Sequence, residues 1–154
     1  MWRRLRYVLG LVALCAIATC PTARRSCVAQ NRMREADQLT DALADRVAKR
    51  VALTGRVPPT PAPLTPVPSC CEQGGTCAPE AATWAGSGWR ELEFSVDGPF
   101  RFSYEYAPDP SGMSAIVRAV GQVDCDAPPQ TIQISLTVNG TQVERLKTRS
   151  ETSE

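Results

Sequence analysis

A run of six prolines within twelve residues, VPPTPAPLTPVP (57–68), limits the folds open to this chain of 154 residues. Proline fixes the backbone φ angle and removes the amide donor, so neither a helix nor an internal strand can continue through the run. We expect an extended polyproline-II connector here, neither helix nor sheet. The segments before and after it differ in hydrophobic period, and each is therefore interpreted separately.

The segment before the prolines is predicted to be an amphipathic helix. Between residues 28 and 53, apolar side chains recur every three or four positions. The stripe consists of Met33, Ala36, Leu39, Leu43, Val47 and Val51. Gly55 and the prolines that follow it give a stop signal, and Asp45 is placed to pair with Lys49 one turn later. We interpret the segment as a core-packing helix, with a basic membrane-surface helix as the alternative.

The N-terminal residues are typical of export or membrane anchoring. MWRRLRY is basic, and VLGLVALCAIATC (8–20) contains only uncharged, mostly apolar residues. As a helix this run would span about 20 Å, shorter than the roughly 30 Å hydrocarbon core of a bilayer, which fits a secretory signal. The residues 16–18 form a small-residue cleavage site, and Cys20 ends a loose lipoprotein box. Cleavage, lipidation at Cys20 and retention as an inner-membrane anchor all stay open.

Charge and composition narrow the classes of function. Residues 1–56 carry eleven Lys/Arg against four Asp/Glu, whereas residues 57–154 carry six against twelve. Because the basic residues flank an apolar run, we expect contact with phospholipid and not with nucleic acid. The chain has no histidine, which excludes histidine-dependent triads and zinc sites that need imidazole. We therefore predict a protein that is not an enzyme, with no cofactor and no identified small-molecule substrate.

Beyond Gly88 the apolar period changes to two, which predicts strands. WRELEFSV and FRFSYEY are expected to form a hairpin around Asp97-Gly98. One face of the second strand carries Phe100, Phe102, Tyr104 and Tyr106. MSAIVRAVGQV (113–123) is expected to be a central strand, apolar on both faces. TIQISLTV and TQVERL flank a second hairpin turn at Asn139-Gly140, and the polar residues from Lys147 onward are expected to be frayed.

These segments together predict an α+β fold, in which the amphipathic helix packs on the aromatic face of a sheet with four or five antiparallel strands. The expected divisions are a signal or membrane-anchor segment (1–27), the amphipathic helix (28–56), the Pro-rich connector (57–69), a disulfide-stapled β domain (70–147) and a polar tail (148–154).

Four cysteines, Cys70, Cys71, Cys77 and Cys125, lie in the predicted β domain. In an oxidising compartment four cysteines indicate two disulfides, and three pairings are possible. Because adjacent cysteines rarely bond to each other, we expect one bond within the 70–77 loop and one that reaches Cys125. The alternative is a four-cysteine zinc site, although the usual pair of Cys-x₂-Cys spacings is missing.

The remaining candidate groups are loop carboxylates and two tryptophans. Asp109, Asp124 and Asp126 are weak candidates for calcium ligands, because carboxylate oxygens suit that ion. In the alternative interpretation these three aspartates are solvated carboxylates that stabilise turns. We predict no metal site. Trp84 and Trp89 flank AGSG, and we expect them to cap the sheet core rather than form a binding platform.

Two stretches, W..LEFSVDGPFRFSYEY (89–106) and MSAIVRAVGQVDCD (113–126), resemble the sheet of the type IV pilin and pseudopilin superfamily. The resemblance implies an N-terminal hydrophobic helix, its amphipathic extension and an antiparallel sheet packed on that extension. It also implies a bacterial cell-envelope protein that is anchored in the inner membrane or exported to the periplasm or surface, with other pilin-like subunits as possible partners.

The prepilin cleavage signal of that family is absent, because Gly10 is not followed by the expected phenylalanine, threonine and glutamate. Prepilin processing and glutamate-dependent insertion into a filament are therefore not implied. The expected function is filament-type or pseudopilus-type assembly, or surface interaction. The alternative is a secreted or lipid-anchored periplasmic binding module that does not polymerise.

Overall fold

The computed structural model describes the backbone of residues 2–151 and the side chains of residues 27–151. The chain divides into two units, residues 1–32 and 33–154. The first unit contains the N-terminal part of helix α1 (Trp2–Thr54). The second contains the rest of α1, the 3-10 helix η1 (Ala81–Trp84), the helix α2 (Ser87–Leu92) and five strands. These strands are β1 (Ala62–Thr65), β2 (Phe102–Pro108), β3 (Ser114–Gly121), β4 (Gln130–Asn139) and β5 (Gln142–Glu151).

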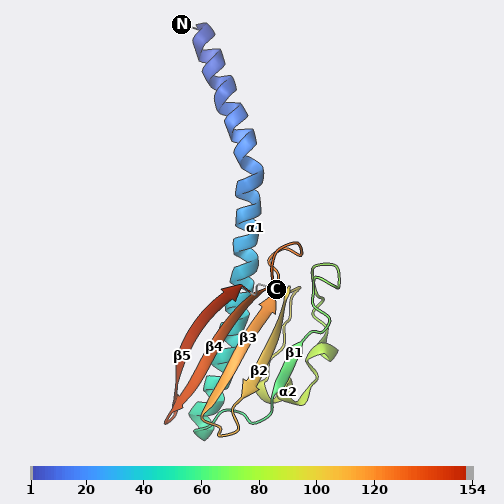
Figure 1. Cartoon of the computed structure of the whole chain (residues 1–154), viewed down its shortest axis with the longest axis vertical. Coiled ribbons are helices and arrows are strands. Elements are labelled where there is room, and N and C mark those ends of the chain that lie inside the picture. The colour runs from blue at the N-terminus through green and yellow to red at the C-terminus, as the bar shows by residue number, and fades with distance from the viewer. Residues whose placement is uncertain (1, 152–154) are drawn as a thin grey trace. The chain divides into compact units, whose positions relative to one another are not determined.

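The five strands form one antiparallel sheet in the order β1-β2-β3-β4-β5, so each strand pairs with its neighbour in sequence. The C-terminal part of α1 lies across one face of this sheet (Figure 1). A helix on a five-stranded antiparallel sheet confirms the predicted α+β class. The sheet leaves β1 and β5 as its two edge strands.

Within residues 33–54, α1 buries one stripe. The fully buried residues are Ala36, Thr40, Leu43, Ala44, Val47 and Val51. Four of them belong to the predicted stripe, whereas Met33 and Leu39 are only partly buried. Thr40 is tolerated there because its hydroxyl donates to the Ala36 carbonyl at 2.6 Å. The helix ends at Thr54, and the φ of 70° at Gly55 suits the left-handed position after a helix, as the stop signal predicted.

The covered face of the sheet carries the aromatic and aliphatic core. The register aligns Tyr106, Val117 and Ile134 in one row across β2, β3 and β4, and all three are buried. The four aromatic residues predicted to share a face are likewise buried: Phe100, Phe102, Tyr104 and Tyr106. Large aromatic side chains remove much apolar surface from water, so these four residues contribute much of the buried area on this face of the sheet.

Strand β3 lies in the centre of the sheet, as predicted, but it is not buried on both faces. Its burial alternates, with Ala115, Val117 and Ala119 buried. Ile116 is 38% exposed on the opposite face, and Arg118 beside it is paired with a carboxylate. The apolar run was misread as two buried faces because alanine and valine tolerate a half-exposed strand equally well.

The Pro-rich connector departs from its prediction, because residues 62–65 form the edge strand β1. An edge position tolerates proline, since only one side of such a strand needs amide donors. The tryptophan segment also departs from its prediction. Residues 87–92 form α2 instead of a strand, and Cys77 occupies the place opposite Phe100 in an isolated bridge. The expected hairpin around Asp97-Gly98 is therefore not formed.

The second hairpin is confirmed. Strands β4 and β5 pair from Asn139↔Gln142 outward, so the two turn residues are Gly140 and Thr141, one position later than the predicted Asn139-Gly140. Gly140 has a φ of 66°. The predicted frayed tail is wrong, because β5 continues to Glu151 and stays paired with β4. Polar side chains misled the prediction here, since three of them make ion pairs with α1 and do not point into solvent alone.

Candidate functional site

One disulfide closes the loop after the connector, and the other joins this loop to the β3–β4 loop. Cys70 is bonded to Cys77 and Cys71 to Cys125, with Sγ–Sγ distances of 2.03 and 2.11 Å. This pairing matches the expectation of one bond within the 70–77 loop and one that reaches residue 125. A disulfide sulfur is not the thiolate that zinc requires, so the pairing opposes the four-cysteine zinc alternative.

Hydrogen bonds hold the disulfide loop in one turn. The Ser69 hydroxyl and amide both donate to the Glu72 carboxylate, at 2.6 and 2.8 Å. These two bonds lower the pKa of Glu72, the hydroxyl having the larger effect. The Gly75 amide donates to the Cys70 carbonyl at 2.7 Å, and the Arg101 guanidinium donates to the Gly75 carbonyl. Gly74 and Gly75, whose φ angles are 94° and 91°, therefore allow the chain to make this turn.

The structure does not bring the three calcium candidates together. Asp109 follows the end of β2, whereas Asp124 and Asp126 follow the end of β3. Because β2 and β3 are antiparallel, these loops lie at opposite ends of a strand about 25 Å long. Hydrogen bonds from the side chain and amide of Ser111 lower the pKa of Asp109. Among the described side chains, no three Cys, Asp or Glu residues gather as a metal site.

The two tryptophans flanking AGSG belong to the core. Trp84 and Trp89 are 4% and 1% exposed, and their ring centroids lie 5.1 Å apart in an edge-to-face arrangement. The Trp89 indole donates to the Thr65 hydroxyl at 3.0 Å, which ties α2 to β1. Phe94, Phe100 and Tyr104 also pack on the Trp84 ring. The predicted cap over the sheet core is therefore the role that their burial supports.

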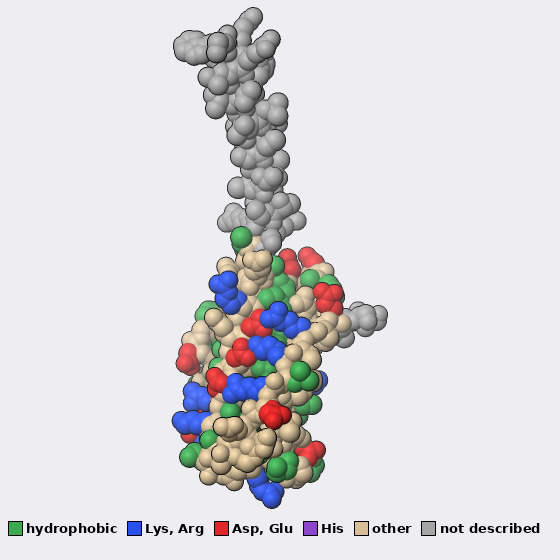
Figure 2. Space-filling view, turned by 90° about the vertical axis from the view of Figure 1, so that its left-hand side faces the viewer, with side chains coloured by type: hydrophobic (Ala, Val, Ile, Leu, Met, Phe, Trp, Pro, Cys, Tyr) green, Lys and Arg blue, Asp and Glu red, His purple; other side chains and the backbone are tan. Residues whose placement is uncertain are grey.

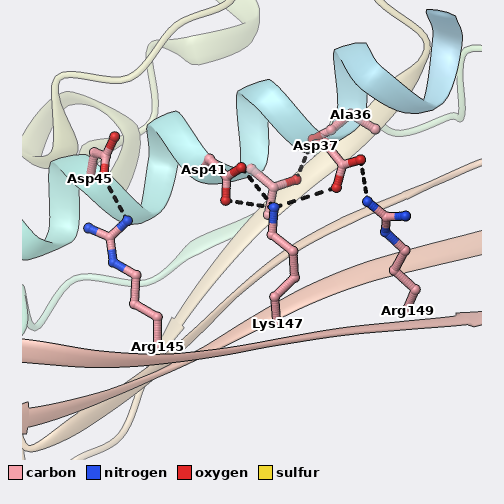
Figure 3. Close-up of polar contacts among 8 residues, drawn as sticks. Ala36, Asp37, Asp41, Asp45, Arg145, Lys147 and Arg149 are labelled. Atoms are coloured by element: carbon pink, nitrogen blue, oxygen red, sulfur yellow. Dashed lines mark hydrogen bonds and ion pairs between the residues drawn. The ribbon is translucent and has the colours of Figure 1, made fainter. Parts of the chain in front are cut away.

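A row of ion pairs connects α1 to β5 (Figure 3). Asp45 pairs with Arg145 at 2.6 Å and Asp41 with Lys147 at 2.7 Å. Asp37 pairs with Arg149 and also lies 3.5 Å from Lys147. We call the three aspartates, Asp37, Asp41 and Asp45, the acidic row. We call Arg145, Lys147 and Arg149 the basic row.

Sequence reasoning missed this pair of rows, although the signal was present. It assigned Asp45 to Lys49 within the helix, whereas the structure pairs Asp45 with Arg145 of β5. The acids recur every four residues and the bases every two. These are the periods that place side chains on one face of a helix and on one face of a strand. Figure 2 views the side of the molecule that lies to the left in Figure 1 and shows acidic and basic side chains next to each other there.

A cleft of about 610 Å³ lies where α1 ends, between the connector and the β2–β3 loop. Five of the twelve residues that line it are prolines: Pro58, Pro59, Pro61, Pro108 and Pro110. Its charged groups already have protein partners. Arg50 donates to the Glu91 carbonyl at 2.9 Å, and Arg56 donates to the Ser111 carbonyl at 3.1 Å. Rigid proline walls preorganise such a cleft for a partly apolar ligand.

The predictions for the N-terminal segment lie outside the described side chains. This holds for the signal or anchor segment and for lipidation at Cys20. Over residues 27–151, no helix is both long enough and apolar enough to cross a membrane.

The chain was compared with protein-family models, curated proteins and solved structures, and none of them matches it.

Proposed function

We propose that this chain is a non-enzymatic, pilin-like protein of the bacterial cell envelope that acts in pilus-type or pseudopilus-type assembly or in surface interaction. The observation that carries the proposal is the order and packing of the elements. The C-terminal part of a long helix covers a sequential antiparallel sheet whose other face holds no described element. In the sequence, this C-terminal part follows a basic and then apolar segment, residues 1–20.

The disulfides support the location in this proposal. Paired cysteines are stable in the periplasm and at the cell surface, and they are rare in the cytosol. Two bonds are present in the β domain, at Cys70–Cys77 and Cys71–Cys125. Together with the basic and apolar N-terminal residues, they favour a protein whose sheet lies on the oxidising side of the inner membrane, with other pilin-like subunits as partners.

The second candidate function is a secreted or lipid-anchored binding module that does not polymerise. The proline-walled cleft favours this reading, because a preformed cavity of about 610 Å³ is large enough for a small ligand or a short peptide. A module of this kind would use the cleft as a single copy, whereas an assembling subunit would use its outer surfaces.

The test is the intact mass of the chain isolated from its native envelope, measured with thiol alkylation before and after reduction. A retained N-terminus in the membrane fraction is the result expected for a pilin-like anchor. Four extra alkylations after reduction are expected from the two disulfides. Diacylglycerol at Cys20, or loss of the first 18 residues, would favour the binding module. A fully reduced cytoplasmic chain would contradict both functions.

Assembly itself is tested by shearing cells and cross-linking the released fraction. A pilin-like subunit should appear there as a ladder of covalent multimers, whereas a binding module should stay monomeric. The matched control is a chain that lacks residues 8–20. It should accumulate inside the cell without disulfides, because the apolar run needed for export is gone.

A further inference from the structure

Strand β5 is held in place in an unusual way for a ten-residue strand. It lies at the edge of the sheet, and nine of its ten residues are exposed, with Val143 partly buried. Its main contacts are the backbone pairing with β4 and the four ion pairs that its three basic side chains make with the acidic row. Releasing β5 would expose little apolar surface of its own, so it belongs to the least stable part of the sheet.

The two charged rows match in spacing and direction. Acids four residues apart on a helix lie about 6 Å apart along its axis. Bases two residues apart on a strand lie about 6.7 Å apart. The pairs run from Asp37–Arg149 to Asp45–Arg145, so the helix and strand are antiparallel, as Figure 3 shows. A shift of β5 by one residue would turn its bases to the other face of the sheet.

The match is also specific within this chain. Three acids at positions i, i+4 and i+8 occur only at 37, 41 and 45, and three bases at positions i, i+2 and i+4 occur only at 145, 147 and 149. A strand that replaced β5 beside β4 would need the same alternating bases to satisfy the acidic row. The second copy of this chain is the partner that carries such a strand.

We propose that the acidic row is a receptor for a basic β-strand and that it accepts β5 of a second copy in place of the chain's own β5. The exchanged strand would make the same backbone pairing with β4 and the same ion pairs with α1. Opening of the Gly140-Thr141 turn is the main change within each chain. This inference rests on the proposed assembly role, because strand exchange would join one copy to the next.

The competing interpretation is that the basic row only protects the sheet edge, since inward-pointing charges discourage the addition of a further strand. Charge reversal distinguishes strand exchange from edge protection. One full-length chain carries D37K, D41K and D45K, and a second carries R145D, K147D and R149D. Each chain repels its own β5, whereas exchange between the two restores every ion pair. The two chains are co-expressed with different affinity tags, and the second is quantified after capture of the first.

The expected result is about tenfold more co-purification for the reversed pair than for a control pair, which corresponds to a modest gain from each of three partly exposed ion pairs. In the control pair, the first chain instead carries E80K, D97K and D126K. These are three exposed positions away from the row, and they give the same change in net charge. Two differently tagged wild-type chains should also co-purify, and less so at high salt.

A chain that carries both sets of reversals tests whether the reversed rows still fold, because its ion pairs are restored within one copy. If this chain folds and the reversed pair co-purifies no better than the control pair, β5 stays on its own helix and the proposal is wrong. If the triple variants do not fold, the milder pair D41K and K147D is measured in the same way and decides the question.

Failure of this inference is distinguishable from failure of the proposed function. Co-purification reports pairing between copies wherever the chain is located. Intact mass and shearing report the envelope location and multimers however they form. Exchange without an envelope location would overturn the proposed function alone, and surface multimers without exchange would overturn this inference alone.

Discussion

The two buried tyrosines of β2 differ in whether the phenol has a hydrogen-bond partner. Tyr106 donates to the Pro58 carbonyl at 2.6 Å, whereas the Tyr104 hydroxyl has no hydrogen-bond partner among the described residues. Burial raises the pKa of both phenols above the ordinary value, and a nearby carboxylate, Glu35 or Glu91 respectively, adds to the effect. Single-residue substitutions therefore have different expected costs at these two positions.

Tyr106→Phe is expected to lower the free energy of unfolding by about 1 kcal/mol, because it leaves a buried carbonyl without its donor. Tyr104→Phe should be close to neutral or stabilising at pH 7, since it removes a buried hydroxyl that lacks a partner. Urea denaturation of both variants measures the difference. Equal losses would contradict the assigned hydrogen bond.

The raised tyrosine pKa values predict a loss of stability at alkaline pH. Above about pH 10 the unfolded chain releases phenol protons that the folded chain retains. The unfolded state is then favoured, by up to about 1.4 kcal/mol per pH unit for each tyrosine. Urea denaturation between pH 8 and 11 should show a shallower decline for Tyr104→Phe than for the wild type. Parallel declines would show that Tyr104 does not contribute.

Gly88 marks a close approach between α2 and β1. A Cβ atom there would lie 2.3 Å from the Pro61 carbonyl oxygen, and backbone atoms cannot move aside as a side-chain tip can. Gly88→Ala is expected to cost about 1–3 kcal/mol in the free energy of unfolding. Gly98→Ala is the matched control, because a Cβ there would meet no atom within 4 Å. Similar urea midpoints for the two variants would contradict this close contact.

Among the secondary-structure elements, β5 is attached to α1 by ion pairs, whereas the other strands are held mainly by apolar packing. Asp37 and Lys147 are the more buried members of the two rows, at 20% and 31% side-chain exposure, whereas Asp45 is 67% exposed. Partly exposed pairs contribute little singly and are screened by salt. The rows therefore set the register of β5 more than they set the stability of the sheet.

Charge reversal of a single ion pair, Asp41–Lys147, should show how strongly α1 and β5 interact through these rows. Asp41→Lys and Lys147→Asp are each expected to destabilise by about 1 kcal/mol, and the double variant should recover about 0.5 kcal/mol of the combined loss. The recovery is expected to be smaller at 1 M salt because of screening. Urea denaturation of the four proteins of this double-mutant cycle measures it. Strict additivity at low salt would mean that the two side chains do not interact.

For the whole molecule, the two disulfides contribute unequally because they close loops of different length. Cys71–Cys125 spans 54 residues and Cys70–Cys77 spans seven. The chain-entropy model gives stabilisation of about 4 and about 2 kcal/mol, respectively. The longer bond also joins the loop after β1 to the β3–β4 loop, so it constrains segments on both sides of the central strand.

Replacement of Cys71 and Cys125 by alanine is therefore expected to lower the free energy of unfolding by about 2 kcal/mol more than replacement of Cys70 and Cys77. Thermal and urea unfolding of the two double variants, without reductant, give the comparison. Cys70 and Cys77 are buried, so their replacement also removes packing contacts. This loss makes the difference in the free energy of unfolding between the two double variants smaller. A larger loss from the short loop would contradict the entropic account.

The fold could be predicted from the sequence for those segments in which the spacing of apolar residues corresponds to the face that is buried in the structure. The helix stripe at Leu43, Val47 and Val51 and the hairpin signal at Asn139-Gly140 are local. Both elements form, although the turn itself lies one residue later than predicted. The expected strand at 89–96 fails, because buried residues two apart can also lie in a short helix followed by an extended segment. Periodicity over so few residues cannot separate these two cases.

The candidate site was less predictable than the fold. The cysteine pairing followed from the rule that neighbours do not bond, but which cysteine reaches Cys125 needed the fold. The calcium candidates, Asp109 and Asp124, could be separated only after the direction of β3 was known. The proline-walled cleft could not be inferred, because its walls come from the connector and the β2–β3 loop, about 50 residues apart in the sequence.

The sequence by itself determined the α+β class, the helix that covers the sheet, the second hairpin and the presence of two disulfides. These features depend on the spacing of apolar residues, on turn residues and on the number of cysteines. Tertiary structure alone decided that the proline-rich run contains the edge strand β1, that residues 87–92 form the helix α2, and that β5 continues to residue 151. These outcomes depend on partners far away in the chain. An edge strand forms only where a neighbouring strand offers backbone hydrogen bonds, and an ion pair forms only where an opposite charge lies nearby. In both cases the partner is distant in the sequence, so the local pattern cannot reveal it.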